Sequence, residues 1–194
     1  MYFNDRYTLK GEGGRHTASQ VFYIEDVFEA YFSLTDLPDR IIELGTDNGS
    51  FSSIIYNLMT NHSLQCEPEH KFDFYSFDIK ERPIELPTRV IFERMDILKS
   101  IPKIGALIEE NTLILCDNGN KIEEVWGLVP YMKKDCVIMA HDYFKDAPAF
   151  YIESSWPVCE IEFNSVRPLL PKYGLDLYHP EIMDKGLWLS LIKK

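Results

Sequence analysis

The sequence lacks the marks of several protein classes. None of its four cysteines belongs to a Cys-x-x-Cys pair, so reduced thiols in the core of a cytoplasmic protein are a better interpretation than a zinc site. No apolar run approaches the roughly 20 residues that span a membrane. The N-terminus also lacks the apolar segment of a signal peptide. We therefore expect a soluble cytoplasmic protein with no membrane partner.

Positive charge is scarce in this chain. Lysine and arginine number 20 against 31 acidic residues, which gives a formal net charge of -11. A nucleic-acid partner requires a basic surface for its phosphates, and the sequence contains no cluster of basic residues. We therefore expect a small-molecule substrate and no nucleic acid. The sequence leaves the oligomeric state open, and a homo-oligomer is compatible with it.

Apolar residues are plentiful enough for one packed domain. The chain has 194 residues, of which 45% are hydrophobic and 13% aromatic, as is typical of globular proteins. We expect residues 20–194 to form a single domain. Residues 1–19 are polar and rich in glycine, and we expect them to form either a lead-in segment or a loop that closes over a ligand.

Residues 40–50, Arg-Ile-Ile-Glu-Leu-Gly-Thr-Asp-Asn-Gly-Ser, carry the most information. A short apolar strand at 41–44 runs into a loop with Gly45 and Gly49, and apolar residues recur at helical spacing from Ser50. A strand, a glycine turn and a helix N-terminus form the first unit of a nucleotide-binding α/β sheet. Glycine lets the backbone approach a ligand, and the helix N-terminus offers free N–H groups.

The spacing within this loop differs from the dinucleotide fingerprint Gly-x-Gly-x-x-Gly. It is Glu43-x-Gly45-x-x-x-Gly49, with Thr46 and Asp47 inside the loop. This spacing argues against a pyrophosphate site and leaves a different nucleoside ligand as the expectation.

Strand and helix patterns alternate along the rest of the chain, which predicts a doubly wound, mostly parallel sheet with helices on both faces. The C-terminal region suggests an antiparallel strand pair formed by 158–163 and 187–192. The other predicted strands are 41–44, 72–79, 89–92, 112–116 and 136–140, and the predicted helices are 20–34, 50–60, 97–108, 122–132 and 147–155, with a loop at 61–71.

Polar residues follow four of the predicted strands. Asp78 ends the second strand, where nucleotide-binding folds bind the ribose hydroxyls; an exposed aspartate at a strand end is the alternative. Asp96 follows the third strand, and its carboxylate is suited to cap the next helix. Asp117 follows the fourth strand, and His141 and Asp142 follow the fifth. Since the carboxyl ends of parallel strands share one edge of the sheet, these side chains should form one site.

The order of these motifs resembles that of the class I S-adenosylmethionine-dependent methyltransferases, and most closely the branch of cephalosporin-hydroxylase-like and sugar O-methyltransferases. The resemblance implies methyl transfer to a small molecule, with a hydroxyl as the expected acceptor. It also implies Mg²⁺ bound by Asp117, His141 and Asp142. The cofactor-binding residues that it implies are Glu43, Gly45, Thr46, Asp47, Gly49, Asp78, Met95, Asp96 and Asp117.

Methyl transfer from a sulfonium requires alignment and, for a hydroxyl acceptor, loss of a proton. A hard cation on oxygen ligands or a basic side chain would assist that loss. The candidate catalytic residues are therefore Asp117, Lys121 and His141. The sequence departs from the catechol-type pattern, because Asn120 occupies the position of the usual lysine and Lys121 follows one residue later. Metal-assisted and metal-free mechanisms both remain open.

Two other functions compete with a methyltransferase. The first is a catalytically silent relative that binds a nucleoside ligand or a partner, which the altered metal-site pattern favours. The second is a nicotinamide-dependent oxidoreductase, in which Asp78 would also bind a ribose. The missing dinucleotide fingerprint counts against this second function.

Overall fold

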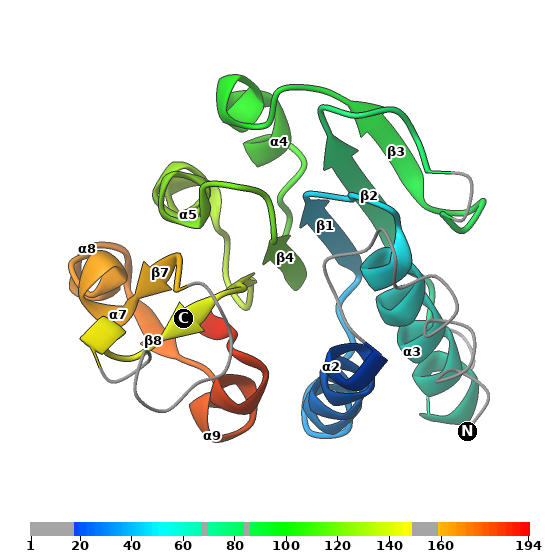
Figure 1. Ribbon diagram of the computed structural model, residues 1–194, viewed down its shortest axis with the longest axis horizontal. Coiled ribbons are helices and arrows are strands. Elements are labelled where there is room, and N and C mark those ends of the chain that lie inside the picture. Colours follow the sequence, from blue (N-terminus) through cyan, green and yellow to red (C-terminus); the bar gives the residue numbers. More distant parts are fainter. Residues whose placement is uncertain (1–17, 67–69, 84–85, 149–158) are drawn as a thin grey trace.

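The computed structural model describes residues 18–66, 70–83, 86–148 and 159–194. These residues form a seven-stranded sheet whose order is β3-β2-β1-β4-β5-β9-β8, with helices on both of its faces (Figure 1). The predicted doubly wound α/β fold is therefore confirmed. The expected lead-in segment lies almost entirely outside the described residues, and so does most of the predicted helix at 147–155.

The strands follow the apolar runs of the sequence closely. Those of the large sheet are β1 (Arg40–Leu44), β2 (Asp73–Asp78), β3 (Ile91–Arg94), β4 (Thr112–Cys116), β5 (Val137–Ala140), β8 (Leu175–Leu177) and β9 (Leu189–Lys193). A separate two-stranded sheet consists of β6 (Tyr143–Phe144) and β7 (Ile161–Glu162).

Helices connect the strands and cover the sheet. The α-helices are α2 (Ala18–Phe32), α3 (Ser50–Cys66), α4 (Ile101–Gly105), α5 (Lys121–Leu128), α7 (Phe163–Val166), α8 (Leu169–Tyr173) and α9 (Pro180–Met183). The described residues also form three short 3-10 helices, η1 (Leu98–Ser100), η2 (Val129–Tyr131) and η3 (Asp184–Gly186). Among the described residues, no helix is long and apolar enough to cross a membrane.

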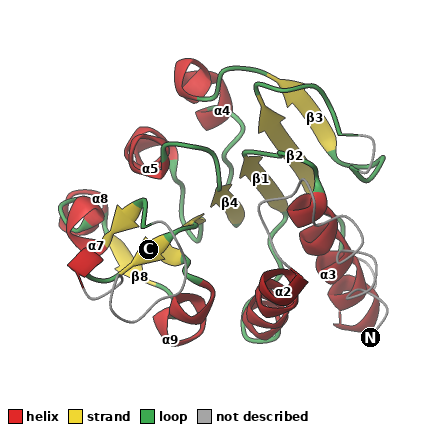
Figure 2. Ribbon diagram, viewed as in Figure 1, coloured by secondary structure: helices red, strands yellow, loops and turns green. Residues whose placement is uncertain are grey.

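Successive side chains of each strand point to opposite faces of the sheet, and each face packs into its own hydrophobic core. Ile41, Leu113 and Leu115 pack with the apolar residues of α2 and α3. Ile42 and Ile114 point to the other face and pack with those of α4 and α5. Figure 2 shows the strands as a central layer between these two groups of helices.

The side of β1 on which the chain adds strands changes after β3, although β1 and β4 are parallel neighbours. From β1 the chain adds β2 and then β3 on one side, so that β3 is the outermost strand there, whereas β4 and β5 lie on the other side. The parallel register aligns the last residues of the central strands, since Leu44 is paired with both Phe77 and Cys116, and Cys116 with Ala140. The residues that follow these strands therefore meet at one edge, next to the switch point where open α/β sheets bind ligands.

The predicted antiparallel strand pair at the C-terminus is present, but one of its two strands differs from the prediction. β9 is antiparallel to both β5 and β8, so β8 takes the place that was expected for residues 158–163. Among the described residues of that segment, Ile161–Glu162 form a strand, and it pairs in parallel with β6. The segment leaves the extended conformation at Phe163, where α7 begins, whereas Leu189 and Leu191 of β9 are fully buried and place that strand inside the sheet.

The helix after Gly49 is longer than its composition suggests. α3 continues through the polar residues 61–66, which were expected to form a loop. His62 is buried, with Nε2 3.2 Å from Oε1 of Glu29 and its ring 6.1 Å from that of Phe32. Packing on α2 therefore extends the helix beyond its apolar stripe.

Candidate active site

A pocket of about 210 Å³ opens at the carboxyl edge of the sheet, where β1, β2, β4 and β5 end. Eight of the predicted site residues line it: Gly45, Thr46, Asp47, Asp78, Asp117, Lys121, His141 and Asp142. Four predicted residues do not line it, namely Glu43, Gly49, Met95 and Asp96. Its remaining lining residues, which the sequence did not single out, are Asn48, Phe51, Ile79, Lys80, Asn118 and Gly119.

Gly45 allows the loop after β1 to pass close to the loop after β4. Its N–H donates to the carbonyl oxygen of Phe77 at 2.9 Å, and its φ is +97°. A Cβ at this position would lie 2.5 Å from the carbonyl oxygen of Asp117 and 2.8 Å from the nitrogen of Asn118. The glycine is therefore required by contact between two strand ends, a reason that the sequence did not reveal.

Gly49 closes the same loop without lining the pocket. Its N–H donates to the carbonyl oxygen of Thr46 at 2.8 Å, and its φ is +80°. Its carbonyl oxygen accepts the N–H of Ser53 at 3.0 Å, so the loop turns directly into α3. The positive φ that this turn requires therefore explains the glycine at position 49.

Asp78 lies at the end of β2 with its carboxylate mostly buried. Oδ2 accepts the N–H of Asp47 at 2.9 Å, and Oδ1 accepts the N–H of Lys80 at 2.8 Å. A carboxylate oxygen has two lone pairs, so each oxygen retains capacity for one further donor. Nζ of Lys80 also forms an ion pair with Oδ1 of Asp47 at 2.6 Å, which joins the ends of β1 and β2.

Met95 and Asp96 follow β3 beside this region. The N–H of Met95 donates to the carbonyl oxygen of Asp78 at 2.8 Å. Asp96 accepts the N–H of Lys99 at 3.3 Å, as predicted for a residue that caps the next helical turn, and it pairs with the Lys99 ammonium at 2.6 Å. These bonds to Lys99 lower the pKa of Asp96.

Glu43 is fully buried behind the pocket wall. Its Oε2 accepts the hydroxyls of Ser52, at 2.6 Å, and Ser76. Since Ser76 donates to Glu43, it accepts the hydroxyl of Thr46 at 2.5 Å, which connects the pocket wall to the buried acid. Among the described residues, Oε1 of Glu43 has no hydrogen-bond partner. Burial raises the pKa of Glu43 to about 7, because a charged carboxylate is disfavoured there.

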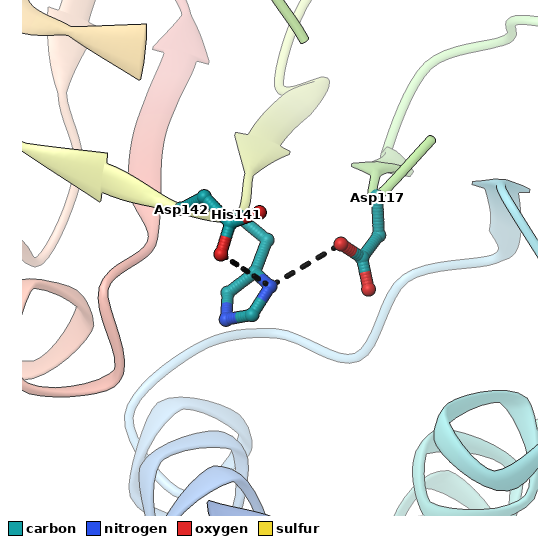
Figure 3. Close-up of side chains that lie close together, drawn as sticks. All are labelled: Asp117, His141 and Asp142. Carbon is teal, nitrogen blue, oxygen red and sulfur yellow. Dashed lines mark hydrogen bonds and ion pairs between the residues drawn. The ribbon is translucent and has the colours of Figure 1, made fainter. Parts of the chain in front are cut away.

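Asp117, His141 and Asp142, which all line the pocket, form a compact cluster (Figure 3). Nδ1 of His141 lies 3.2 Å from Oδ1 of Asp117 and 3.5 Å from Oδ1 of Asp142. One potential ligand atom from each residue lies within 4.8 Å of the others. Asp142 has a φ of +57°, so the chain turns sharply after β5 and directs this carboxylate back to the cluster.

Lys121, the first residue of α5, reaches the same cluster. Its side chain is only 2% exposed, and Nζ lies 2.9 Å from Oδ2 of Asp142 and 3.7 Å from Oδ1 of Asp117. Nζ also donates to Oε2 of Glu160, which precedes β7. Burial disfavours the ammonium, but the carboxylates outweigh that effect and raise the pKa of Lys121.

His141 stacks on Trp188, which precedes β9. The two rings are 4.8 Å apart with an angle of 29° between them. Burial disfavours the charged imidazole, but Asp117 and Asp142 outweigh both burial and the Lys121 charge, so the pKa of His141 is raised. Trp188 is fully buried and also contacts Phe51 of α3. Packing thus fixes the orientation of the imidazole plane.

The helix after Asp117 buries charge where the sequence suggested apolar contacts. Ile122 and Trp126 are 36% and 39% exposed, whereas Lys121 and Glu124 are buried. Burial raises the pKa of Glu124 to about 7, although the N–H of Asn120 and the Lys121 charge oppose this shift. The inner face of the helix therefore serves the site as well as the core.

Several solved structures that match this arrangement of strands and helices are described as methyltransferases. MycE, a methyltransferase from the mycinamycin biosynthetic pathway solved with Mg and SAH, superposes with a TM-score of 0.56 at 12% identity. A Staphylococcus aureus protein assigned as a caffeoyl-CoA O-methyltransferase superposes with a TM-score of 0.55 at 12% identity. The fold is that of the class I S-adenosylmethionine-dependent methyltransferases.

The structural matches cover nearly all of the chain but do not determine an acceptor. The matches cover 99% of this chain and 52% of MycE, and 98% of this chain and 90% of the Staphylococcus protein. The chain thus spans about half the length of MycE. A Plasmodium falciparum protein assigned as a ribosomal RNA methyltransferase also matches, with a TM-score of 0.52, 14% identity and coverage of 94% and 97%. No protein-family model matches the sequence, and no curated protein matches it significantly.

Proposed function

We propose that this protein is a small-molecule methyltransferase that transfers the methyl group of S-adenosylmethionine to a hydroxyl. The observation that carries the proposal is the pocket at the switch point, which combines the Gly45 loop, Asp78 and Asp117 at adjoining strand ends. Asp78 is suited to the ribose because each of its oxygens already accepts one backbone N–H and retains capacity for a hydroxyl.

The charge of the pocket favours this cofactor over a dinucleotide. Four aspartates line the pocket, at positions 47, 78, 117 and 142. S-adenosylmethionine carries a positive sulfonium and a positive amino group, which these carboxylates would attract. The pyrophosphate of a nicotinamide dinucleotide is an anion and would be repelled.

The proposed cofactor contacts follow the predicted motifs. Gly45, Thr46 and Asp47 would approach the methionine portion, Asp78 the ribose and Asp117 the region near the sulfonium. Met95 and Asp96 remain proposals for the adenine, supported by the bond from Met95 to the end of β2. Glu43 and Gly49 would act from behind the wall, by holding Thr46 and closing the turn.

The acceptor is proposed to lie beside Asp117, His141 and Asp142. In-line displacement at the methyl carbon requires the acceptor oxygen to be aligned and relieved of its proton. His141 and Asp117 could receive that proton, and a nearby positive charge would stabilise the resulting oxygen. Mg²⁺ on the three residues is one possible source of that charge, and the Lys121 ammonium is the other.

The motif order supports the sugar O-methyltransferase branch within this fold. The polar residues at the strand ends and the aspartates around the pocket suit a hydroxyl-rich acceptor, which would bind to them through hydrogen bonds. The strongly negative net charge of -11 argues against a nucleic-acid acceptor.

Calorimetric titration with S-adenosylhomocysteine tests the cofactor. We expect micromolar binding by the wild type and about tenfold to hundredfold weaker binding by Asp78→Asn, since a charge-assisted hydrogen bond to the ribose is lost. Asp176→Asn, on the distant strand β8, is the matched control and should leave the affinity unchanged. An Asp78→Asn variant that binds as tightly as the wild type would remove the ribose assignment, and a wild type that does not bind would remove the proposal.

Turnover separates an enzyme from a silent relative. The protein is incubated with S-adenosylmethionine and a panel of sugar and phenolic hydroxyl compounds, and the products are measured by mass spectrometry. Methyl transfer should yield a product about 14 Da heavier than its acceptor, because a methyl group replaces a hydrogen. Tight cofactor binding without transfer to any hydroxyl would favour the silent relative.

A further inference from the structure

The Lys121 ammonium lies beside the carboxylates of Asp117 and Asp142, which are the oxygen ligands that a metal ion in this cluster would need. The ammonium is paired with Asp142, with Glu160 and, at longer range, with Asp117. We infer that Lys121 is a built-in cation that neutralises this cluster in place of Mg²⁺, and that the protein acts without a divalent metal. The second part of this inference rests on the proposed function, whereas the first concerns the folded protein alone.

The distances place ammonium and metal in competition for the same carboxylates. Nζ of Lys121 lies 2.9 Å from Oδ2 of Asp142 and 3.7 Å from Oδ1 of Asp117, and both residues belong to the candidate ligand set. Mg²⁺ requires oxygen ligands at about 2.0–2.1 Å in octahedral geometry. An ion so close to these oxygens would lie a few ångströms from the ammonium and would be repelled by it.

The third candidate ligand is also committed to the carboxylates. Nδ1 of His141 lies between Oδ1 of Asp117 and Oδ1 of Asp142, at 3.2 and 3.5 Å. A ring nitrogen that bridges two carboxylate oxygens carries a hydrogen, and a nitrogen that carries a hydrogen does not coordinate a metal. An imidazole is in any case a softer ligand than Mg²⁺ prefers. The residues, as arranged, do not fit the ion.

The backbone holds Lys121 in this position. Asn120 caps α5 through a hydrogen bond from the N–H of Glu123 to its Oδ1 at 3.2 Å, so Lys121 begins the helix directly beside the strand end. Glu160 is held against the cluster because its N–H donates to the carbonyl oxygen of Asp142 at 2.9 Å. The Lys121 ammonium is therefore surrounded by acids from three separate segments, which offsets the cost of burying it.

Removing the ammonium tests the inference directly. In the full chain, Lys121→Gln should gain saturable Mn²⁺ binding, measured by electron paramagnetic resonance, at least about tenfold tighter than the wild type, because the competing charge is gone. Mg²⁺ titration by calorimetry should follow the same order. Adding Asp142→Asn to Lys121→Gln should abolish the gain, which places the metal at this cluster.

The matched control is Lys99→Gln, which removes an exposed ammonium paired with Asp96. Its Mn²⁺ affinity should equal that of the wild type. A folded Lys121→Gln variant without increased affinity would overturn the inference, and so would a wild type that binds Mn²⁺ as tightly as that variant.

A second measurement needs no change at Lys121, whose loss leaves buried carboxylates unpaired and could prevent folding. The melting temperature of the wild type should be the same in chelator and in millimolar Mg²⁺, because only an ion that binds the native state raises it. A rise that Asp142→Asn abolishes would overturn the inference. S-adenosylhomocysteine titration on the same samples tests the proposed function separately, since cofactor binding and metal binding can be lost independently.

Discussion

Glu43→Gln should change how stability depends on pH. The Glu43 carboxyl is fully buried, and burial raises its pKa from 4.5 to about 7. A glutamine fits the same contacts, because its amide oxygen can accept the hydroxyls of Ser52 and Ser76. Its amide nitrogen would take the position of Oε1, which has no hydrogen-bond partner among the described residues.

The direction in which the free energy of unfolding changes with pH follows from the protons that the native and unfolded states bind. Between pH 4.5 and about 7 the native protein keeps a proton on Glu43 that the unfolded chain has lost, so the free energy of unfolding falls as pH rises. Below pH 4.5 both states are protonated and Glu43 makes no contribution. A shift from 4.5 to about 7 corresponds to at most about 3 kcal/mol, fully expressed above the native pKa.

Urea unfolding at a series of pH values measures the effect. Relative to the wild type, Glu43→Gln should be about equally stable near pH 4 and more stable near pH 8, by up to about 3 kcal/mol. Part of the decline should persist in the variant, because the pKa of Glu124 is also raised to about 7. Glu93→Gln, a substitution on the outermost strand, should keep the wild-type dependence. A stability difference between Glu43→Gln and the wild type that stays constant over this range would show that Glu43 is ionised in the folded protein.

Two substitutions test the packing around the pocket. Gly45→Ala should lower the free energy of unfolding by about 2 kcal/mol or more, because its Cβ would overlap the Asp117 backbone at a φ of +97°; Gly119→Ala, with open space around its Cβ, should change it by less than about 0.5 kcal/mol. Equal urea midpoints for the two variants would contradict the close approach of the strand ends. Trp188→Leu should cost about 2 kcal/mol or more through the cavity left against His141, and a wild-type urea midpoint would show that the ring is not part of the packed core.

The strands and the polar edge could be predicted because each depends on a local pattern. The run at 112–116 is apolar throughout, and β4 occupies those residues. Once parallel strands are assumed, Asp78, Asp117 and His141 must share an edge, whatever the details of packing. The order of the strands alone is therefore enough to bring most of the pocket residues to one edge of the sheet.

Lys121 and Glu160 could not be placed in the same way. A lysine at the start of a helix is typical of a solvated position, and its burial here depends on carboxylates that lie 21 and 39 residues further along the chain. The continuation of α3 through His62 similarly depends on contacts with α2. Such features result from tertiary partners, which a local pattern does not contain.

The outermost strand β3 bears on the tendency of the sheet to pair edge to edge with other molecules. Its outer backbone groups pair with no strand of the described chain, and Ile91 is 48% exposed, so the edge could accept a strand from another molecule. The last two residues of β3 carry opposite charges, and Glu93 pairs with Lys103 while Arg94 pairs with Glu81. A strand added at this edge would have to accommodate these charged side chains, which discourages edge-to-edge pairing of sheets into aggregates.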